Sequence, residues 1–584
     1  MCAGDLSIRE ELDPLFNPRS VAVIGATNQW NKWGFSTFVS VLDGFKGKVY
    51  PVNIQEPQVL GRLAYRRVTE IPPDEPVDLA VFVIPAEAIP GVMEDCVRKG
   101  VRAGVIISAG FAETGEAGRR LQREVCRIAR KGPIRFIGPN CMGFYTGSSD
   151  LKAFMFPLSL KKGPLGFVSQ GGNVGAAVVQ TAYARGMGFH RYVSCGCAAD
   201  IQIEDYIEYF GEDEEVKVIL AYIEGLNDGQ RFVEKVRKVT AKKPVVALKP
   251  GKTEAATKAI TSHSGALSGS SELYDSAFRK AGVIRVDTAE ALLDVAAAFL
   301  TQPLPRGRRV AIITPGGSYG VMSADACASL GLDVVRLSEE TIAELDSFFP
   351  PRWSHGNPVD PAGDRNFIAY MKAPELLLRL PEIDALIFMG FDSFARFASS
   401  ATLFATMSQE SAHTFRRLLR SVSQTLLGEG EGRDHDSGNP WVCEAIKRVV
   451  DIFFSLFGTS EKGEVEAFGD RLVSLIAKGK VPADIGERFR KALSVFVEEE
   501  GMEGMGDPFA EVFEPMMEGL LLEWIESYGK PIITTTFMGA ATPMTEMGYY
   551  AYPSAEQAAY VLAKLVEYRE QLGRDGYAPR HDGH

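Results

Sequence analysis

Short apolar runs rich in β-branched residues alternate with helical patterns along much of this chain, and this alternation constrains the fold most. The early runs are Ser20–Gly25, Lys48–Val52, Leu79–Ile84, Gly104–Ser108 and Arg135–Ile137. Helical periodicity separates them, as in Ile89–Lys99 and Glu116–Arg130. Continuous apolar strands are buried on both faces, which is typical of parallel sheets covered by helices. The pattern therefore predicts a doubly wound α/β fold.

The same alternation returns after residue 148. The later runs are Leu165–Ser169, Val216–Ile223, Pro244–Leu248, Arg309–Thr314, Ile383–Met389 and Pro531–Thr535. A proline-rich stretch, 302–306, indicates a linker among them. From 396 to 527 the pattern is helical instead, which predicts an insertion within the last α/β unit. We expect domains at 1–148, 149–303 and 304–395 with 528–574, a helical insertion at 396–527 and a flexible tail at 575–584.

The composition is that of an ordinary globular chain and excludes several classes of partner. The chain has 63 basic and 75 acidic residues, a net charge of −12, which argues against nucleic acid or an anionic membrane. No apolar run approaches the roughly 20 residues of a membrane helix, and we expect no signal peptide. The 8 cysteines are scattered without zinc spacing. We therefore expect no metal site and a cytoplasmic protein with reduced thiols.

The loops that follow the first-unit strands are candidate binding elements. Gly25 ends a strand and leads through Thr27 into a helix, a geometry that suits a phosphate. The dinucleotide fingerprint G-x-G-x-x-G is absent, and the second strand ends in Asn53 instead of the acid that holds an NAD ribose. These departures disfavour an NAD(P) oxidoreductase. The alternative that Gly25 is needed only to form the tight turn stays open. Cys141 has no histidine near it in the sequence, so we expect a packing or ligand-contact residue rather than a nucleophile.

A second set of strand-end residues suits phosphoryl chemistry. The turn Gln170–Asn173 places glycines at a helix N-terminus, and Glu224 ends a strand of the same unit. His263 lies in the loop Thr261–Gly269, among small hydroxyl-bearing residues that permit motion. A carboxylate such as Glu224 can hold one nitrogen of an imidazole and leave the other free to attack. The alternatives are an ordinary strand-end carboxylate and a loop histidine without a role.

Taken together, these motifs resemble the α subunit of the NDP-forming acyl-CoA synthetases, the superfamily of ADP-forming acetyl-CoA synthetase and succinyl-CoA synthetase. In family order the motifs are SVAVIGA, KVYPVN, PVDLAVFVIPA, GVIISAGFAE, IGPNCMG, GPLGFVSQGGNVG, TSHSGALSG and NPVDPAGD. The resemblance covers residues 15–395 and 528–572. It implies a Rossmann-like CoA-binding domain followed by two flavodoxin-like domains, the last with a helical insertion.

The resemblance also implies the site residues. His263 would be phosphorylated transiently and Glu224 would orient it. Ser264 stands where the family has threonine, and Gly171 stands where it has serine, which removes a hydroxyl. The implied CoA pocket consists of Gly25, Thr27, Lys32, Asn53, Pro85 and Asn140. The implied phosphate-binding turn consists of Ser169, Gln170, Gly171, Gly172 and Asn173.

The activity implied by the resemblance is the reversible conversion of acyl-CoA, ADP and phosphate into an organic acid, CoA and ATP. The intermediates are an acyl phosphate and a phosphohistidine. No ATP-grasp region is visible in the sequence, so the nucleotide and Mg²⁺ are expected on a separate ATP-grasp β subunit, in a hetero-oligomer. The competing hypothesis is a non-catalytic CoA-binding regulatory protein. The sequence leaves the acyl group and the choice between ADP and GDP open.

Overall fold

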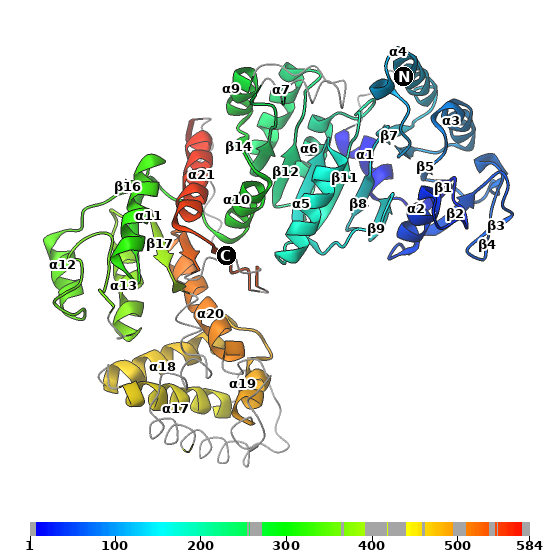
Figure 1. Cartoon of the computed structure of the whole chain (residues 1–584). Coiled ribbons are helices and arrows are strands. Elements are labelled where there is room, and N and C mark those ends of the chain that lie inside the picture. The colour runs from blue at the N-terminus through cyan, green and yellow to red at the C-terminus, as the bar shows by residue number, and fades with distance from the viewer. Residues whose placement is uncertain are drawn as a thin grey trace. The chain divides into compact units, whose positions relative to one another are not determined.

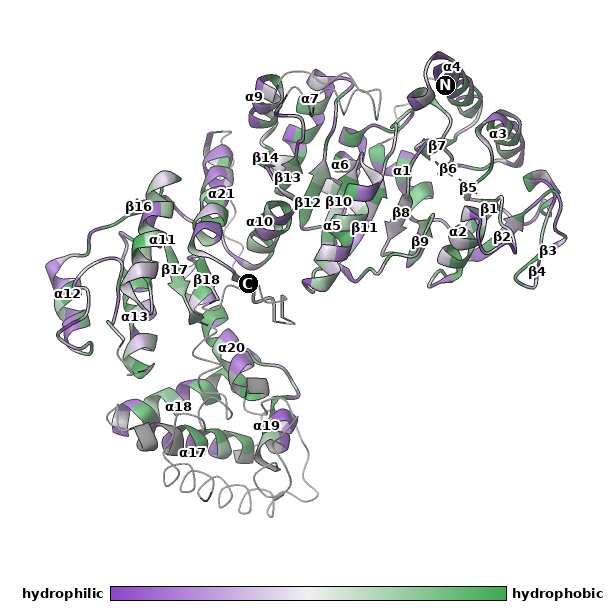
Figure 2. Cartoon of the chain, in the orientation of Figure 1, coloured by the Kyte–Doolittle hydropathy of each residue, from purple (hydrophilic) through white to green (hydrophobic). Residues whose placement is uncertain are grey.

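The computed structural model describes residues 7–253, 256, 271–363, 367–391, 417, 440–457, 462–494, 510–536, 544–545 and 547–574. The chain divides into two compact units (Figure 1). One unit comprises the residues up to Ala296 together with those from Glu570 onward, and the other comprises Ala297–Arg569. Parallel sheets form the core of both units, as the apolar runs predict. Figure 2 colours most of these strands green, since they are hydrophobic, whereas the helices mix purple and green.

The first sheet has five parallel strands in the order β2-β1-β5-β6-β7. They are β1 (Ser20–Ile24), β2 (Lys48–Val52), β5 (Leu79–Phe82), β6 (Ala103–Ile106) and β7 (Arg135–Ile137). The associated helices are α1 (Ile8–Phe16), α2 (Trp33–Leu42), α3 (Ile89–Lys99) and α4 (Glu116–Ala129). A small hairpin of β3 (Gln58–Val59) and β4 (Arg62–Leu63) follows β2. The strand order reverses between β1 and β5, which is where ligands of open α/β sheets bind.

The second sheet has seven strands in the order β14-β13-β12-β10-β11-β8-β9. They are β8 (Gly143–Thr146), β9 (Leu151–Phe154), β10 (Lys162–Ser169), β11 (Phe189–Ser194), β12 (Val218–Tyr222), β13 (Val245–Leu248) and β14 (Ile284–Val286). The helices are α5 (Gly172–Ala184), α6 (Ile203–Glu212), α7 (Gly229–Thr240), α9 (Ser271–Ala281) and α10 (Ala289–Thr301). In this sheet the pairs β11–β8 and β8–β9 are antiparallel, and all the other pairs are parallel. The hairpin β8–β9 spans the expected domain boundary at residue 148, because β8 pairs with the second sheet.

The third sheet has the order β16-β15-β17-β18-β19. Its strands are β15 (Arg309–Ile313), β16 (Asp333–Val334), β17 (Ala385–Met389), β18 (Ile532–Thr535) and β19 (Ala551–Tyr552). The helices of its own α/β pattern are α11 (Gly317–Ser329), α12 (Glu339–Asp346), α13 (Phe367–Arg379) and α21 (Ala555–Arg574). Between the paired strands β17 and β18 lie α17 (Pro440–Phe457), α18 (Lys462–Ala477), α19 (Ile485–Ser494) and α20 (Ala510–Tyr528). The chain is thus α/β with a helical insertion in its last sheet, and the domain boundaries remain a proposal.

Backbone hydrogen bonds join the loop after β7 to the loop after β11 and so connect the first two sheets. Cys197 N donates to Pro139 O at 2.9 Å, and Ala199 N donates to Gly138 O at 3.0 Å. A Cβ at Gly196 would lie 2.4 Å from the carbonyl oxygens of Pro139 and Asn140, so only glycine fits there. These contacts hold the carboxyl edges of the two sheets together.

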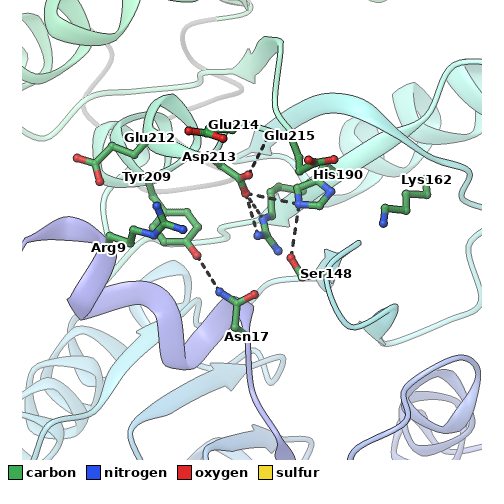
Figure 3. Close-up of a pocket in the computed structure, with 11 residues that line it drawn as sticks. Arg9, Asn17, Ser148, Lys162, His190, Tyr209, Glu212, Asp213, Glu214 and Glu215 are labelled. Carbon is green, nitrogen blue, oxygen red and sulfur yellow. Dashed lines mark hydrogen bonds and ion pairs between the residues drawn. The ribbon is translucent and has the colours of Figure 1, made fainter.

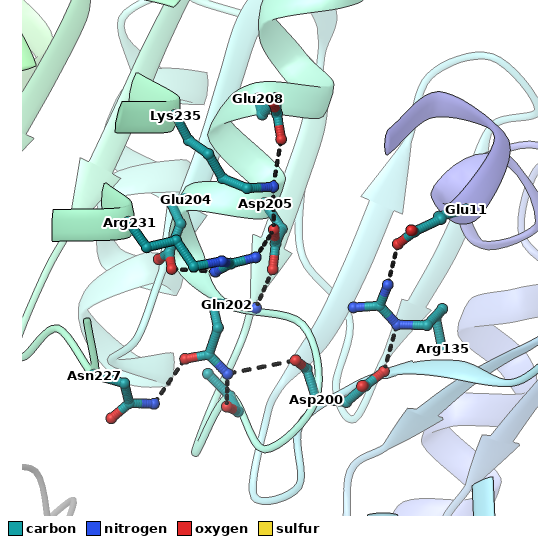
Figure 4. Close-up of polar contacts among 11 residues, drawn as sticks. Glu11, Arg135, Asp200, Gln202, Glu204, Asp205, Glu208, Asn227, Arg231 and Lys235 are labelled. Carbon is teal, nitrogen blue, oxygen red and sulfur yellow. Dashed lines mark hydrogen bonds and ion pairs between the residues drawn. The ribbon is translucent and has the colours of Figure 1, made fainter. Parts of the chain in front are cut away.

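Ionic contacts reinforce the same region and the helix pair α6–α7 (Figure 4). Arg135 of β7 bonds Asp200 at 2.9 Å and also pairs with Glu11. On α6, Glu204 and Asp205 are 3% and 2% exposed, and both pair with Arg231 of α7. A buried carboxylate needs such a partner, because removal from water strongly disfavours its charge.

Within the described ranges, no helix is long and apolar enough to cross a bilayer. The same residues contain no cluster of three or more histidine, cysteine, aspartate or glutamate side chains arranged to hold a metal ion. The seven cysteines among the described residues are all free.

Replacing Arg231 should destabilise the first unit. In Arg231→Met, Glu204 loses its cationic partner inside the protein, and the free energy of unfolding should fall by about 3 kcal/mol. Urea denaturation measures the change. The matched control is Arg120→Met, whose side chain is 74% exposed in its ion pair with Glu116, and it should cost less than about 1 kcal/mol. Equal losses in the two variants would contradict the role given to the buried cluster.

Glu518 on α20 should make the stability of the second unit depend on pH. Burial raises the pKa of this carboxyl to about 7, against a hydrogen bond with Thr545 that lowers it. Because the folded chain holds this proton more tightly than the unfolded chain, the stability that Glu518 contributes is complete below pH 4.5. That stability is lost as the pH rises through 7. The free energy of unfolding should fall by about 3 kcal/mol over that range.

Glu518→Gln should abolish this loss, so that its midpoint of thermal unfolding exceeds that of the unaltered chain at pH 8 and not at pH 4. Glu487→Gln, at an exposed position of α19, is the control and should leave the pH profile unchanged. An unaltered profile in Glu518→Gln would refute the assignment.

Candidate active site

The reversal points of the first and second sheets open into a single pocket of about 890 Å³. Its lining residues follow the carboxyl ends of parallel strands. They include Gly25 after β1, Val83–Pro85 after β5, Ser108 after β6, Asn140 after β7, Gln170–Asn173 after β10, Cys197 after β11 and Glu224 after β12. The volume lies within the range of about 300–1,000 Å³ typical of small-molecule sites. The pocket therefore brings together most of the residues expected from the sequence.

The first-sheet end of the pocket depends on a close backbone approach at Gly25. This residue has φ +95°, and a Cβ there would lie 2.2 Å from Val83 O. A Cβ at Gly34 would lie 1.9 Å from Gly25 O, so the first turn of α2 rests directly on the loop after β1. Lys32 caps this helix and lines the pocket, as does Pro85. A helix N-terminus beside a lysine is suited to phosphate groups, such as those of CoA.

Thr27 and Asn53 were expected in the CoA pocket, but they are not among its lining residues. Asn53 Nδ2 donates to Ala26 O at 2.7 Å, and its Oδ1 accepts from Gln55 N and Glu56 N at 2.8 and 3.0 Å. Thr27 is buried and bonds Glu56. Contacts with Thr27 and Asn28 lower the pKa of Glu56. Thr27 and Asn53 thus hold the shape of the loop after β1, and the Glu56 carboxylate bonds Thr27 and Asn28 of that loop.

The turn after β7 supplies Asn140 and the buried Cys141. Asn140 has φ +55°, and its N–H donates to Ser108 O at 3.0 Å. The Cys141 thiol is 3.3 Å from Ile106 O, and burial raises its pKa to about 12. A thiol held protonated in this way is a poor nucleophile. Cys141 is thus buried and also lines the pocket, which fits a packing or ligand-contact residue.

The second-sheet end of the pocket is built on the turn that begins α5. Gly171, Gly172 and Asn173 line the pocket at this helix N-terminus, where first-turn N–H groups have no partner within the helix. Ser169 is buried instead, and its Oγ donates to Gly171 O at 2.7 Å. The backbone N–H groups in this turn and the positive helix end suit a phosphoryl group.

Gln170 ties this turn to Glu224. Its Oε1 accepts from Glu224 N at 2.5 Å and from Gly225 N at 2.9 Å. A Cβ at Gly171 would lie 2.8 Å from the Tyr222 ring and 3.2 Å from Glu224 Oε1. The glycine at position 171, in place of the family's serine, therefore accommodates the close approach of these two side chains.

Glu224 is 6% exposed and lines the pocket. Lys249, also buried, directly follows β13, and its Nζ is 4.4 Å from the centroid of the Tyr274 ring. Burial and, to a lesser extent, the Arg285 charge lower the pKa of Lys249 to about 8, against the opposing effect of the Glu224 charge. Leu226 N donates to Tyr274 Oη at 3.1 Å. His263 and the loop 261–269 lie outside the described residues.

The pocket also contains residues that sequence patterns do not identify. Trp33, Met142, Met155 and Tyr222 line it. Large apolar residues usually belong to the core, and their place in a sequence rarely distinguishes a core residue from one that lines a pocket. Trp33 follows the loop after Gly25, and Tyr222 stands two residues before Glu224, so their proximity to strand ends is the signal that could have found them.

A separate pocket of about 590 Å³ contains Ser148, His190 and Asp213, but it does not form a nucleophile triad (Figure 3). Ser148 Oγ and Asp213 Oδ2 both approach the same ring nitrogen, Nε2 of His190, at 3.5 and 3.6 Å. A triad needs the serine and the carboxylate on different nitrogens. Asp213 is held by Arg191 at 2.8 Å, and burial followed by the Arg191 charge lowers the pKa of His190.

Comparison with known proteins agrees with this arrangement. A family model described as a CoA binding domain matches residues 19–147. One described as a succinyl-CoA ligase like flavodoxin domain matches 162–299, and one described as a ligase-CoA domain matches 310–431. The chain is 44% identical over 376 residues to the acetate–CoA ligase (ADP-forming) II subunit alpha of Pyrococcus furiosus, covering 64% of this chain and 81% of that one.

Two further relatives extend the comparison. The acetate–CoA ligase (ADP-forming) of Methanocaldococcus jannaschii is 39% identical, over 61% of this chain and 49% of its own length. A solved dinucleotide-forming acetyl-coenzyme A synthetase 1 from Ca. Korarchaeum cryptofilum shares the fold, with a TM-score of 0.67 at 24% identity, covering 97% of this chain and 99% of that one. The chain therefore belongs to the NDP-forming acyl-CoA synthetase family, in which its relatives include ADP-forming acetate–CoA ligase alpha subunits.

Proposed function

We propose that this protein is the α subunit of an ADP-forming acyl-CoA synthetase, which interconverts acyl-CoA, ADP and phosphate with an organic acid, CoA and ATP. One observation carries the proposal. A single pocket has Gly25 and the positively charged Lys32 at one end, and the N-terminus of α5 and Glu224 at the other. In an extended acyl-CoA the nucleotide part would occupy the first end, and the thioester would lie at the second end, which suits phosphoryl transfer. A purely regulatory CoA binder has no use for the second end and is not favoured.

The chemistry begins at the turn Gln170–Asn173. An oxygen of inorganic phosphate attacks the thioester carbonyl carbon, the carbon–sulfur bond breaks, and the CoA thiolate takes a proton that phosphate releases. The products are acyl phosphate and CoA. The N–H groups and positive end of α5 stabilise the charge on the phosphoryl oxygens without a full countercharge.

His263 then attacks the phosphorus atom of acyl phosphate, and the carboxylate of the organic acid leaves. Glu224 accepts a hydrogen bond from the second imidazole nitrogen and holds the ring with the attacking nitrogen unprotonated. The terminal β-phosphate oxygen of ADP finally attacks the phosphorus of phosphohistidine, which releases His263 and forms ATP. Mg²⁺ would accompany the nucleotide and neutralise its phosphate charge.

The nucleotide site belongs, in this proposal, to an ATP-grasp β subunit acting in trans. Relatives named as alpha subunits match over four fifths of their length, whereas relatives named as the ligase without a subunit designation match over about half of theirs. The assembly is thus a hetero-oligomer that acts on a small organic acid and CoA. We place it in the cytoplasm, in keeping with the free thiols of the described cysteines.

Labelling of His263 tests the covalent step. The protein is incubated with its ATP-grasp partner, Mg²⁺ and γ-labelled ATP. The unaltered chain should acquire acid-labile, base-stable label, and His263→Ala should acquire none, because it lacks the nucleophile. CoA binding by His263→Ala shows that the variant is folded. Absence of label from the unaltered chain with a competent partner, while CoA still binds, would reject the catalytic function.

Glu224 should act as a positioning residue for the histidine. Glu224→Gln should lower kcat by about 10²–10³-fold, because an amide fixes the imidazole tautomer less well than a carboxylate. The dissociation constant for CoA should stay unchanged. The control is Glu215→Gln, an exposed carboxyl before the opposite end of β12, which should keep full activity. A parallel loss of CoA affinity in Glu224→Gln would assign Glu224 to the structure of the pocket instead.

A further inference from the structure

Two tryptophans stand unusually exposed in the loop between β1 and α2. Trp30 is 80% exposed and Trp33 is 55% exposed, and of the two only Trp33 lines the active-site pocket. An indole left in water forgoes the favourable burial of a large apolar surface. Such a ring at the wall of a binding pocket is therefore a candidate ligand contact.

The backbone of Trp33 is held in place by its neighbours. Trp33 is the first residue of α2, and Gly34 follows it in the close contact with Gly25 described above. Phe35 N donates to Lys32 O, and Lys32 N donates to Gln29 O, each at 3.0 Å. Preorganisation of this kind lowers the entropy cost of ordering the contact when a ligand binds.

A second anchor fixes the preceding part of the loop. Asn28 Nδ2 donates to Glu56 Oε2 at 2.6 Å and to Gln58 O at 2.8 Å, while its Oδ1 accepts from Leu60 N at 2.9 Å. The loop that carries Trp33 is therefore tied to the hairpin β3–β4 and, through Glu56, to the loop after β2. The indole is presented at the pocket wall by a loop held at both ends.

The pocket has a direction that identifies which part of CoA meets this wall. Under the proposed function, the thioester must lie at the second-sheet end, near Glu224 and the turn at Gly171–Gly172, where phosphate attacks. An extended CoA then places its opposite end, the 3′-phosphoadenosine diphosphate, among Gly25, Lys32 and Trp33. This end of CoA carries the 3′-phosphate, the diphosphate and an aromatic base.

We propose that Trp33 is the stacking platform for the adenine ring of CoA and thereby selects nucleotide-bearing thiols over shorter pantetheine thiols. The inference rests on the proposed function and deepens it. An adenine stacks on an indole face through dispersion and burial, and Lys32 beside it supplies the positive charge for a phosphate. Trp30 lies outside the pocket lining and has no part in this contact.

The test compares thiol ligands in isothermal titrations of the full chain. Trp33→Ala should weaken binding of CoA about tenfold, the typical effect of losing one base–aromatic stack. The same variant should bind 4′-phosphopantetheine, which lacks the adenosine, as the unaltered chain does. Trp33→Phe keeps an aromatic face and should retain most of the CoA affinity. Trp30→Ala, a tryptophan of the same loop outside the pocket, should bind both ligands normally.

The outcomes separate this inference from the proposed function. If the unaltered chain binds CoA and Trp33→Ala binds it equally well, the stacking assignment is overturned while the ligase proposal stands. Equal weakening of CoA and 4′-phosphopantetheine would also overturn it, because the indole would then shape the pocket generally. If Trp33→Ala changed which organic acids the enzyme uses but left the CoA affinity unchanged, the indole would contact the acyl group instead of the adenine, and the stacking assignment would be overturned. Failure of the unaltered chain to bind CoA would reject the proposed function itself.

Discussion

The hydrogen bonds between the loop after β7 and the loop after β11 are the constraint on which the active-site pocket depends. Each of the first two sheets has its own reversal point, and either alone would give a separate crevice. The bonds of Cys197 and Ala199 to the 138–139 carbonyls set these crevices edge to edge. Gly196 permits the approach, because any side chain there would strike the opposing carbonyls. A ligand can therefore extend from one sheet to the other without leaving the pocket.

Close backbone packing serves a different purpose at the two ends of this pocket. At the first-sheet end, Gly25 and Gly34 allow a helix to rest on the strand-end loop, which places Lys32 at the wall. At the second-sheet end, Gly171 makes room for Tyr222 and Glu224 beside the start of α5. The first end thus provides charge for binding, and the second provides a carboxylate next to an anion-binding turn for chemistry.

Much of this architecture could be predicted from the sequence, because buried strands carry their signal in short apolar runs. The first-sheet strands and the turns at Gly25 and Gln170–Asn173 lie where those runs predict them. Strand β11 is not predicted from the sequence because His190 and Arg191 interrupt its apolar run. The structure buries Arg191 with its guanidinium bonded to Asp213 and packed over the rings of Phe16 and Tyr209. The resemblance implies CoA contacts for Thr27 and Asn53, but no sequence pattern shows that their polar atoms bond Glu56 and Ala26 within the protein. The place of Trp33 in the pocket lining is not predictable from the sequence, because the exposure of its ring depends on the tertiary structure.

The place of the helical insertion has a consequence for how this chain can diversify. Strands β17 and β18 are parallel neighbours, so the chain must cross from one end of the sheet to the other between them, and a helix such as α20 is the usual connection. One crossover helix satisfies that requirement, and the residues between β17 and α20 are additional to it. Their length can change without shifting the strand register as long as the apolar contacts of α17, α18 and α19 with the core of the third sheet are kept. This part of the gene is therefore a tolerant site for acquiring or losing a module, and homologues should differ in length here before they differ in their sheets.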